Sequence, residues 1–299
     1  GAASLSSATP TSISSSGNVY TLGVGLSGTP NGAEVLTVNP VDNGIYDALG
    51  NEGTTSQSNN AANLKDKTPP VFTGISIASD NNAIYLTISE AVFNTNGGSG
   101  ALESSDFTFT ISGGTATLSS SQPGEIASNG NVYTLSILLA GTADGTETLT
   151  INPIGNGIYD AGGNEASTSQ SNNSVTLNDN TAPIISSITL ASDNSAVAVT
   201  FSEAVYNAAG GSGALEVSDF SFSMSGGLAS LSSVTPTSLS KNSNVYTLSI
   251  SLSGTSNGNE TLTVNPLDNG IYDSVGNEAA TVQSNNSIKL NDKVSPVIA

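Results

Sequence analysis

Short runs of alternating apolar and polar residues recur along the chain, and polar, glycine-rich stretches separate them. In residues 83–90, AIYLTISE, the apolar Ile84, Leu86 and Ile88 occupy every second position. In an extended chain successive side chains point to opposite faces, so these three residues share one face of a strand. No stretch shows the 3.6-residue period of an amphipathic helix. The pattern therefore predicts a protein built from β-strands.

Residues 71–183 contain enough of these runs to form a complete domain. Sequences rich in Gly, Asp and Asn, such as SDNN at 79–82, separate the runs and predict turns. Seven short strands in about 113 residues are typical of an immunoglobulin-like β-sandwich, although this chain has none of the Cys or Trp residues that mark antibody domains. The predicted strands are residues 71–78, 83–90, 106–111, 115–119, 131–139, 146–151 and 173–178.

The same motifs return at one fixed spacing. NVY begins at residues 18, 131 and 244, and 131 − 18 = 244 − 131 = 113. A period this long predicts tandem globular modules, because each copy is large enough to bury its own core. The fold class predicted is all-β, with tandem immunoglobulin-like seven-stranded β-sandwiches and a 113-residue repeat. The predicted domains are residues 1–70 (the C-terminal part of a module), 71–183 and 184–296 (whole modules), and 297–299 (the start of a further module).

Residues 1–70 have no counterpart of residues 71–113, so two origins for this segment are open. It is either an excerpt from a longer polypeptide or a domain that another chain completes. Only three residues follow Pro296, too few to supply the missing strands to another copy. We therefore expect an excerpt.

Composition removes several classes of function. The chain has no Cys and no His, which excludes disulfides, Cys/His zinc sites and nucleophile–histidine catalysis. Its net charge of −19 makes nucleic acid and anionic membranes poor partners. No apolar run has the length of a membrane span. Because each candidate carboxylate recurs in both whole modules, we expect no enzyme activity.

Three stretches carry a resemblance to a known family: TAPIISSITLASDNSAVAVTFSEAV, ALEVSDFSFSMSG and IYDSVGNEA. They resemble the bacterial immunoglobulin-like repeats of large surface adhesins, S-layer-associated proteins and cyanobacterial motility surface proteins. The stretch LNDNTAP at 177–183 is similar to the calcium-binding linkers of cadherins. The resemblance covers the whole chain and implies an extracellular array without enzyme activity that often depends on calcium (Ca²⁺).

The acidic residues test that implication. If the strands alternate up and down, loops bearing several acids meet at one end of each module, and the preceding segment brings one more acid to it. Carboxylates crowded without basic partners repel one another, and a hard cation with six to eight oxygen ligands relieves the repulsion. The predicted metal ligands are Asp66, Glu90, Asp106 and Asp160 for the first whole module and Asp179, Glu203, Asp219 and Asp273 for the second.

Another interpretation of these acids stays open. Asp and Asn are common in turns because their side chains accept hydrogen bonds from nearby backbone amides, so IYDAGGNE at 158–165 is also a candidate Asx turn without a metal.

The expected function is the structural repeat region of an extracellular bacterial adhesin or surface filament. It would act as a calcium-stiffened stalk at the cell surface, with neighbouring modules and other copies in a filament as partners. The alternative is an array that binds a surface glycan or protein receptor through flexible loops such as NGGSGAL at 96–102.

Overall fold

The computed structural model describes residues 1–297, and the chain divides into two compact units, Gly1–Asn178 and a second unit from Asp179 onward. Strands dominate both units, and the helical elements within the described residues are the single-turn 3₁₀ helices Ser104–Asp106 and Val217–Asp219. In the described range no helix has the length and apolar character that crossing a membrane requires. The fold is all-β, as the alternating pattern predicts. Of the predicted start of a further module, residues 298 and 299 lie outside the described residues.

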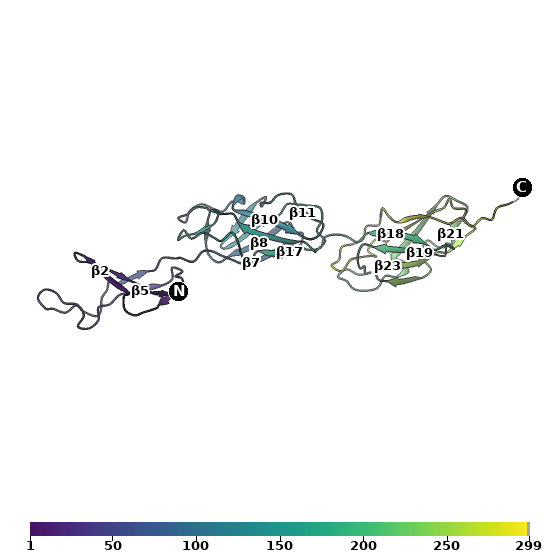
Figure 1. The fold of residues 1–299 in the computed structure, drawn as a ribbon. Coiled ribbons are helices and arrows are strands. Elements are labelled where there is room, and N and C mark those ends of the chain that lie inside the picture. Colours follow the sequence, from purple (N-terminus) through teal and green to yellow (C-terminus); the bar gives the residue numbers. More distant parts are fainter. Residues whose placement is uncertain (298–299) are drawn as a thin grey trace. The chain divides into compact units, whose positions relative to one another are not determined.

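Residues 71–178, the central module, form two larger antiparallel sheets (Figure 1). One sheet has four strands in the order β12–β13–β8–β7, and the other has three in the order β10–β15–β17. Two short pairs, β9–β16 and β11–β14, complete the module. The bounds are β7 (Phe72–Ile77), β8 (Ala83–Ile88), β9 (Val92–Phe93), β10 (Phe107–Ser112), β11 (Thr117–Leu118), β12 (Ile126–Asn129), β13 (Val132–Ser136), β14 (Leu139–Ala140), β15 (Thr148–Pro153), β16 (Tyr159–Asp160) and β17 (Ser174–Thr176).

The core of the central module joins its two sheets. Ile84 and Leu86 of β8 and Leu149 and Ile151 of β15 are fully buried and belong to one apolar cluster. Polar residues of the same strands, such as Thr150, alternate with them and are less buried. This alternation follows from the strand period of two, so the sequence pattern itself fixes which face of each sheet is apolar.

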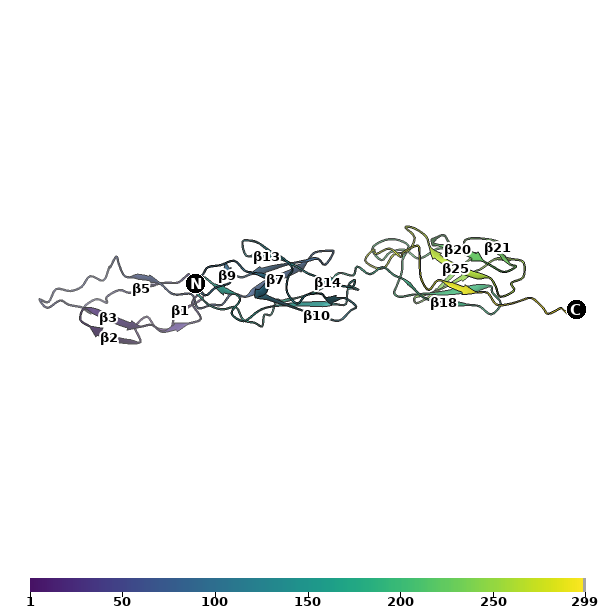
Figure 2. The same ribbon diagram turned by 90° about the horizontal axis from the view of Figure 1, so that it is seen from above.

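The second unit has the same two larger sheets (Figure 2), and it has its own core. Its strand β18 begins 113 residues after β7, since 185 − 72 = 113, and the other large strands keep that offset. Tyr246 is buried and packs edge-on against Phe201 with 5.8 Å between ring centroids. The bounds are β18 (Ile185–Leu190), β19 (Ala196–Phe201), β20 (Phe220–Ser225), β21 (Ser230–Leu231), β22 (Leu239–Asn242), β23 (Val245–Ser249), β24 (Leu252–Ser253), β25 (Thr261–Pro266) and β26 (Ser287–Lys289).

Residues 1–70, the N-terminal segment, contain three separate two-stranded pairs, β1–β4, β2–β3 and β5–β6. Many of the segment's apolar side chains remain exposed, among them Tyr20 and Ile45. Tyr20 is exposed, whereas Tyr133 and Tyr246, at the equivalent positions of the two whole modules, are buried. The bounds are β1 (Ser4–Leu5), β2 (Ser12–Ser16), β3 (Val19–Gly23), β4 (Leu26–Ser27), β5 (Val35–Thr37) and β6 (Ala61–Asn63).

Each of the seven predicted strands of the central module overlaps an observed strand, but the predicted strand 131–139 is divided. It breaks into β13 and β14, which pair with different partners. Leu138, between them, is 46% exposed although it continues the apolar run. The pattern also misses β9, β12 and β16, because two of them are only two residues long and β12 is an edge strand, IASN, without apolar–polar alternation.

Candidate functional site

Three carboxylates meet at one end of the central module. Asp66 lies in the segment before β7, Glu90 follows β8, and Asp160 ends β16. Each side chain offers an oxygen, and these oxygens lie within 4.8 Å of one another. Asp160 is fully buried, whereas the other two are half-buried. Acids that are far apart in sequence are therefore concentrated into a space the size of a cation's coordination sphere.

Asp160 is held in place by a tight turn. The backbone N–H of Asn164 donates to its Oδ1 and the side-chain amide of Asn164 donates to its Oδ2, both at 2.7 Å. On the other side, Asp160 pairs with Val92 in the β16–β9 ladder. These bonds compensate the burial of a carboxylate and fix its orientation.

Asp66 is positioned by its own local turn, in which the N–H of Thr68 donates to Oδ1 at 2.8 Å. This acid stands three residues before Pro69 in the sequence DKTP. Asp66 therefore has two roles, since it caps a turn and also delivers an oxygen to the cluster.

The pKa of Glu90 reports the crowding of negative charge. Burial raises the pKa of this carboxyl from 4.5 to about 7, and the charges of Asp160 and Asp66 contribute to the rise. A carboxyl in this position is only partly ionised at neutral pH because a third negative charge is unfavourable there. A bound cation would reverse the sign of that environment and favour the ionised form.

The second unit contains the same cluster 113 residues later, formed by Asp179, Glu203 and Asp273 with oxygens within 4.8 Å. Asp273 is fully buried, and its Oδ1 accepts three backbone hydrogen bonds, including one from Asn277 at 2.8 Å. The side-chain amide of Asn277 also donates to the backbone carbonyl of Asp179 at 3.1 Å. Asn277 thus links the chain entering the module to the loop that carries Asp273.

The N-terminal segment shows which of these contacts belong to the turn alone. Asp47, which corresponds to Asp160, accepts the same pair of hydrogen bonds from Asn51, each at 2.8 Å. The side-chain hydrogen bond from Asn51 lowers the pKa of Asp47, in contrast to the raised pKa of Glu90. Asp47 is exposed and belongs to neither three-acid cluster. The Asx turn therefore forms without a cluster, and the case for a cation depends on the convergence of the three acids.

Asp106 and Asp219, the fourth predicted ligand of each module, lie outside the clusters. The Oδ2 of Asp106 accepts a hydrogen bond from the backbone N–H of Glu103 at 2.7 Å, which caps the 3₁₀ turn Ser104–Asp106. Asp219 makes the same bond with Glu216. Burial raises the pKa of both acids, and the hydrogen bond opposes that rise. Each of these aspartates stands three residues after a glutamate, and the two acids form a capping box. A pattern of acids in the sequence does not distinguish a capping box from a metal site.

Another buried acid was not identified from the sequence as a special residue. Glu147 is fully buried, and its Oε1 accepts hydrogen bonds from the backbone N–H groups of Thr115 and Ala116 at 2.8 and 2.9 Å. The N–H of Asp144 donates to Oε2 at 3.1 Å. Glu260 makes the equivalent bonds in the second unit and Glu34 makes two of them in the N-terminal segment. We call this arrangement the glutamate clasp. Recurrence of Glu at 34, 147 and 260 is the signal that would have identified it.

The loop at 96–102, the candidate recognition loop, is a closed turn. Thr95 Oγ1 donates to the backbone carbonyl of Ser99, and the two residues also form an isolated β-bridge. Leu102 at its end is buried in the core. Positive φ angles at Gly97, Gly98 and Gly100 allow the chain to reverse direction here. The loop is thus anchored at both ends.

Comparison of the sequence with protein-family models gives no match, and no curated protein matches it either.

Proposed function

We propose that this chain is the structural repeat region of an extracellular bacterial adhesin or surface filament, in which bound calcium stiffens a stalk of immunoglobulin-like modules. The observation that carries the proposal is the recurrence of one three-carboxylate cluster, at Asp66, Glu90 and Asp160 and again at Asp179, Glu203 and Asp273. A cluster of like charges is costly, so its repetition at the same positions favours a ligand that offsets the repulsion.

The sheet arrangement supports the immunoglobulin-like assignment. Each whole module combines a four-stranded and a three-stranded antiparallel sheet around one apolar cluster. Immunoglobulin constant-type domains also divide seven strands into four and three. Fold alone does not specify function, so the proposed role depends on the acids and on the tandem order of the modules.

The donor set suits calcium in particular. All three side chains offer carboxylate oxygens, and the chain has no His or Cys to favour a softer transition metal. Between Lys67 and Lys241 the sequence contains no basic residue, so this stretch is strongly acidic. Six to eight ligands are needed, so water and backbone carbonyls would complete the coordination sphere.

Calcium bound in this way would act as a clamp between a linker and a module. Asp179 belongs to the chain before β18. Glu203 follows β19, and Asp273 lies in the loop between β25 and β26. One ion shared by these acids would restrain the entering chain against the module. Binding that is restricted to the folded state would also stabilise it, by about 2.7 kcal/mol at a hundredfold excess over the dissociation constant. A chain without disulfides gains a cross-link by this route.

The test is calorimetry and small-angle scattering of the full chain in millimolar calcium and in excess EDTA. Chelation is expected to lower the unfolding temperature and to broaden the distribution of interatomic distances. The double variant Glu90→Gln, Glu203→Gln should abolish both effects, while Glu125→Gln, which changes an exposed acid, should keep them. Unchanged melting and scattering in EDTA would overturn the proposal and leave the acids as turn residues.

A further inference from the structure

The first and last strands of the central module, β7 and β17, lie side by side although they belong to different sheets. Near the start of both strands, the side chain of Asn172 is hydrogen-bonded to Phe72, and beyond their ends the side chain of Asn178 is hydrogen-bonded to Ala78. The partners are 100 residues apart at both ends, so the two strands run in the same direction. The chain therefore enters the module along β7 at one end and leaves it along β17 at the other.

Side-chain amides join the two strands at the end where the chain leaves. Asn81 is only 2% exposed, and its Nδ2 donates to the backbone carbonyl of Asn178 at 2.8 Å. The N–H of Asn178 donates in return to Oδ1 of Asn81 at 2.8 Å, and the Asn178 side chain donates to the carbonyl of Ala78 at 2.9 Å. Asn81 has a φ of 59°, in the left-handed region that asparagine tolerates. One residue thus shapes the turn after β7 and holds the chain that follows β17.

A second pair of amides joins the strands at the end where the chain enters. The N–H of Phe72 donates to Oε1 of Gln170 at 3.0 Å, and Nδ2 of Asn172 donates to the carbonyl of Phe72 at 3.3 Å. The amide of Gln170 also donates to the carbonyl of Ser167 at 2.8 Å, which fixes the position of the acceptor oxygen. We call the bonds at both ends the amide clamp, which is formed by Asn81, Gln170, Asn172 and Asn178.

The second unit has a clamp at the equivalent positions. Asn194 is 2% exposed and exchanges hydrogen bonds of 2.8 and 2.9 Å with the backbone of Asn291. The side chain of Asn291 donates to the carbonyl of Ala191 at 3.1 Å. At the other end, Oε1 of Gln283 accepts the N–H of Ile185 at 3.0 Å. Since each module has its own core, the recurrence shows that the clamp belongs to the repeat.

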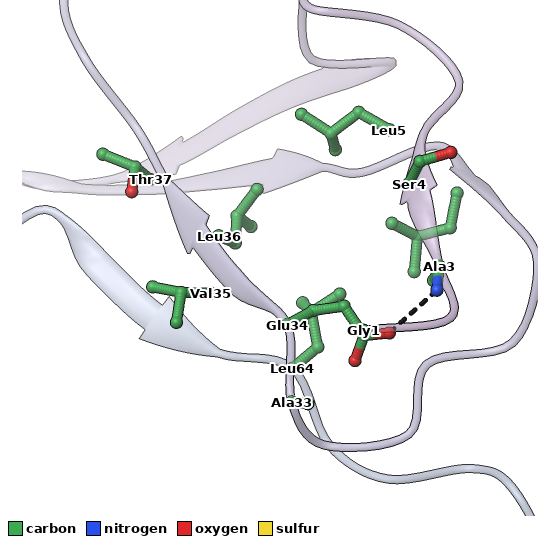
Figure 3. Close-up of a pocket in the computed structure, with 11 residues that line it drawn as sticks. Gly1, Ala3, Ser4, Leu5, Ala33, Glu34, Val35, Leu36, Thr37 and Leu64 are labelled. Atoms are coloured by element: carbon green, nitrogen blue, oxygen red, sulfur yellow. Dashed lines mark hydrogen bonds between the residues drawn. The ribbon is translucent and has the colours of Figure 1, made fainter.

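The last strand is also held on its other side. β17 pairs with β15, and beyond that ladder the N–H of Leu177 donates to the backbone carbonyl of Glu147 at 3.0 Å. Leu64 makes the same bond with Glu34 at 2.9 Å in the N-terminal segment, where Figure 3 shows the glutamate clasp and Leu64 beside a pocket. A pull on the chain beyond residue 178 therefore acts on the clamp and on β15 together.

The direction of the two strands decides how the clamp responds to tension. A pull on both ends of the module drives β7 and β17 past each other along their length, because the chain enters and leaves at opposite ends. Bonds at the two ends of the pair then share the force and break together, whereas the bonds of a strand that is peeled off break one at a time. The barrier to breaking them governs the rate of forced unfolding.

We propose that each whole module carries tension through its amide clamp, which must break before the core opens. The tension is that of the proposed stalk, so in this respect the inference rests on the proposed function. The clamp itself contains none of the clustered acids Asp66, Glu90 and Asp160, and it is expected to act with or without calcium.

The experiment stretches single molecules of the full chain, held at its two ends, in EDTA. The two whole modules should give two unfolding steps of equal length, because their strands keep the same spacing. Asn81→Gly removes the bonds between Asn81 and Asn178, and glycine retains the positive φ. At one constant force, one of the two steps should become at least about tenfold faster. The other step, with Asn194 intact, should keep the rate of the wild type, and adding Asn194→Gly should accelerate it as well.

Asn173→Ala is the matched control. The side chain of Asn173 donates to Oδ1 of Asn152 at 2.8 Å, so it joins the chain before β17 to β15 and not to β7. Urea unfolding measures the stability of each variant without force. Relative to its loss of stability in urea, Asn81→Gly should accelerate forced unfolding more than Asn173→Ala does. If the rates under force simply follow the stabilities in urea, the amides have only a structural role and the proposal is overturned.

A milder variant covers the case in which Asn81→Gly does not fold. Asn178→Ala changes an exposed side chain and removes its bond to Ala78, so the same step should accelerate by a smaller factor. An unchanged rate would contradict the proposal.

This test and the test of the calcium-stiffened stalk can fail separately. The pulling experiment in EDTA examines the clamp without any bound cation, whereas the melting and scattering experiments compare calcium with EDTA. A faster step in Asn81→Gly together with no response to calcium would support the clamp and remove the role of calcium. A clear response to calcium with unchanged steps in Asn81→Gly would overturn the clamp alone.

Discussion

Glu90 and Asp160 have carboxylate oxygens within 4.8 Å of each other, although 70 residues separate them in the sequence (160 − 90 = 70). Asp160 is oriented by Asn164, so it does not turn away from its neighbour. The repulsion therefore appears in the pKa of Glu90, which burial and the two aspartates raise to about 7.

The first prediction concerns the pH dependence of calcium binding to the full chain. Calcium requires ionised Glu90, so binding is expected to release a proton and to weaken as the pH falls below about 7. At this site the affinity should drop by about tenfold per pH unit well below that pKa. Calorimetric titrations at pH 5.5, 6.5 and 8, in buffers of different ionisation enthalpy, measure both quantities. An affinity that does not change with pH, without proton release at the cluster of Asp66, Glu90 and Asp160, would contradict this prediction.

Without calcium, the raised pKa of Glu90 has the opposite consequence for stability. The folded state holds its proton more tightly than the unfolded state, so the contribution of Glu90 to stability is largest below pH 4.5 and is lost as the pH rises towards about 7. In EDTA, Glu90→Gln is therefore expected to stabilise the protein at pH 8 and to have little effect at pH 4. Denaturant unfolding of both proteins at the two pH values checks the sign, and a destabilised variant at pH 8 would show that the ionised acid is favourable there.

A matched pair of variants separates the turn from the cluster. Asp160→Asn and Asp47→Asn each remove one acceptor from the same pair of asparagine hydrogen bonds. Only Asp160 belongs to a three-acid cluster. We expect Asp160→Asn to diminish the rise in unfolding temperature that calcium causes, and Asp47→Asn to leave it intact. Equal losses in the two variants would mean that the turn, and not the cluster, is responsible.

The glutamate clasp predicts a strong effect of a small change. Glu147→Gln replaces one acceptor oxygen by an amide nitrogen that faces backbone N–H groups, and is expected to cost about 2–4 kcal/mol of unfolding free energy. Urea unfolding at pH 7 measures the cost, with the exposed Glu125→Gln as the control. If both variants unfold at the same urea concentration, the buried hydrogen bonds make no net contribution to the free energy of unfolding.

The clasp also predicts the response of the protein to acid. Burial raises the pKa of Glu260, but hydrogen bonds from Ala229, Asn257 and Leu228 outweigh burial and lower it to about 2. A lowered pKa contributes stability that is complete above the unfolded value of 4.5 and is lost as the pH falls towards about 2. The wild-type protein should lose stability over this range, and Glu260→Gln should lose less. Unfolding curves at pH 5, 4 and 3 test the difference between them.

Core substitutions should distinguish the whole module from the N-terminal segment. Leu149 is fully buried in the central core, and Leu149→Ala is expected to cost about 3–4 kcal/mol. Leu36 occupies the equivalent position but is only half-buried beside an open pocket, so Leu36→Ala should cost about 1 kcal/mol or less. Site-resolved hydrogen exchange in each segment measures both. A large loss on Leu36→Ala would indicate that residues 1–66 bury this side chain in solution.

The sequence by itself determined the class of fold, the repeat and most of the strands. Alternation of residues such as Ile84, Leu86 and Ile88 identifies a strand and its buried face, because the side-chain period of a strand is two. It also indicated that Asp66, Glu90 and Asp160 would gather at one end of a module, since strand direction alone decides at which end a loop falls.

The tertiary structure decided the roles that depend on neighbours distant in the chain. Asp106 and Asp160 look alike in sequence, yet one caps a local turn and the other joins a cluster. Glu147 became a clasp, and Tyr20 became an exposed residue, because burial and hydrogen bonding depend on which strands surround a side chain rather than on its own identity.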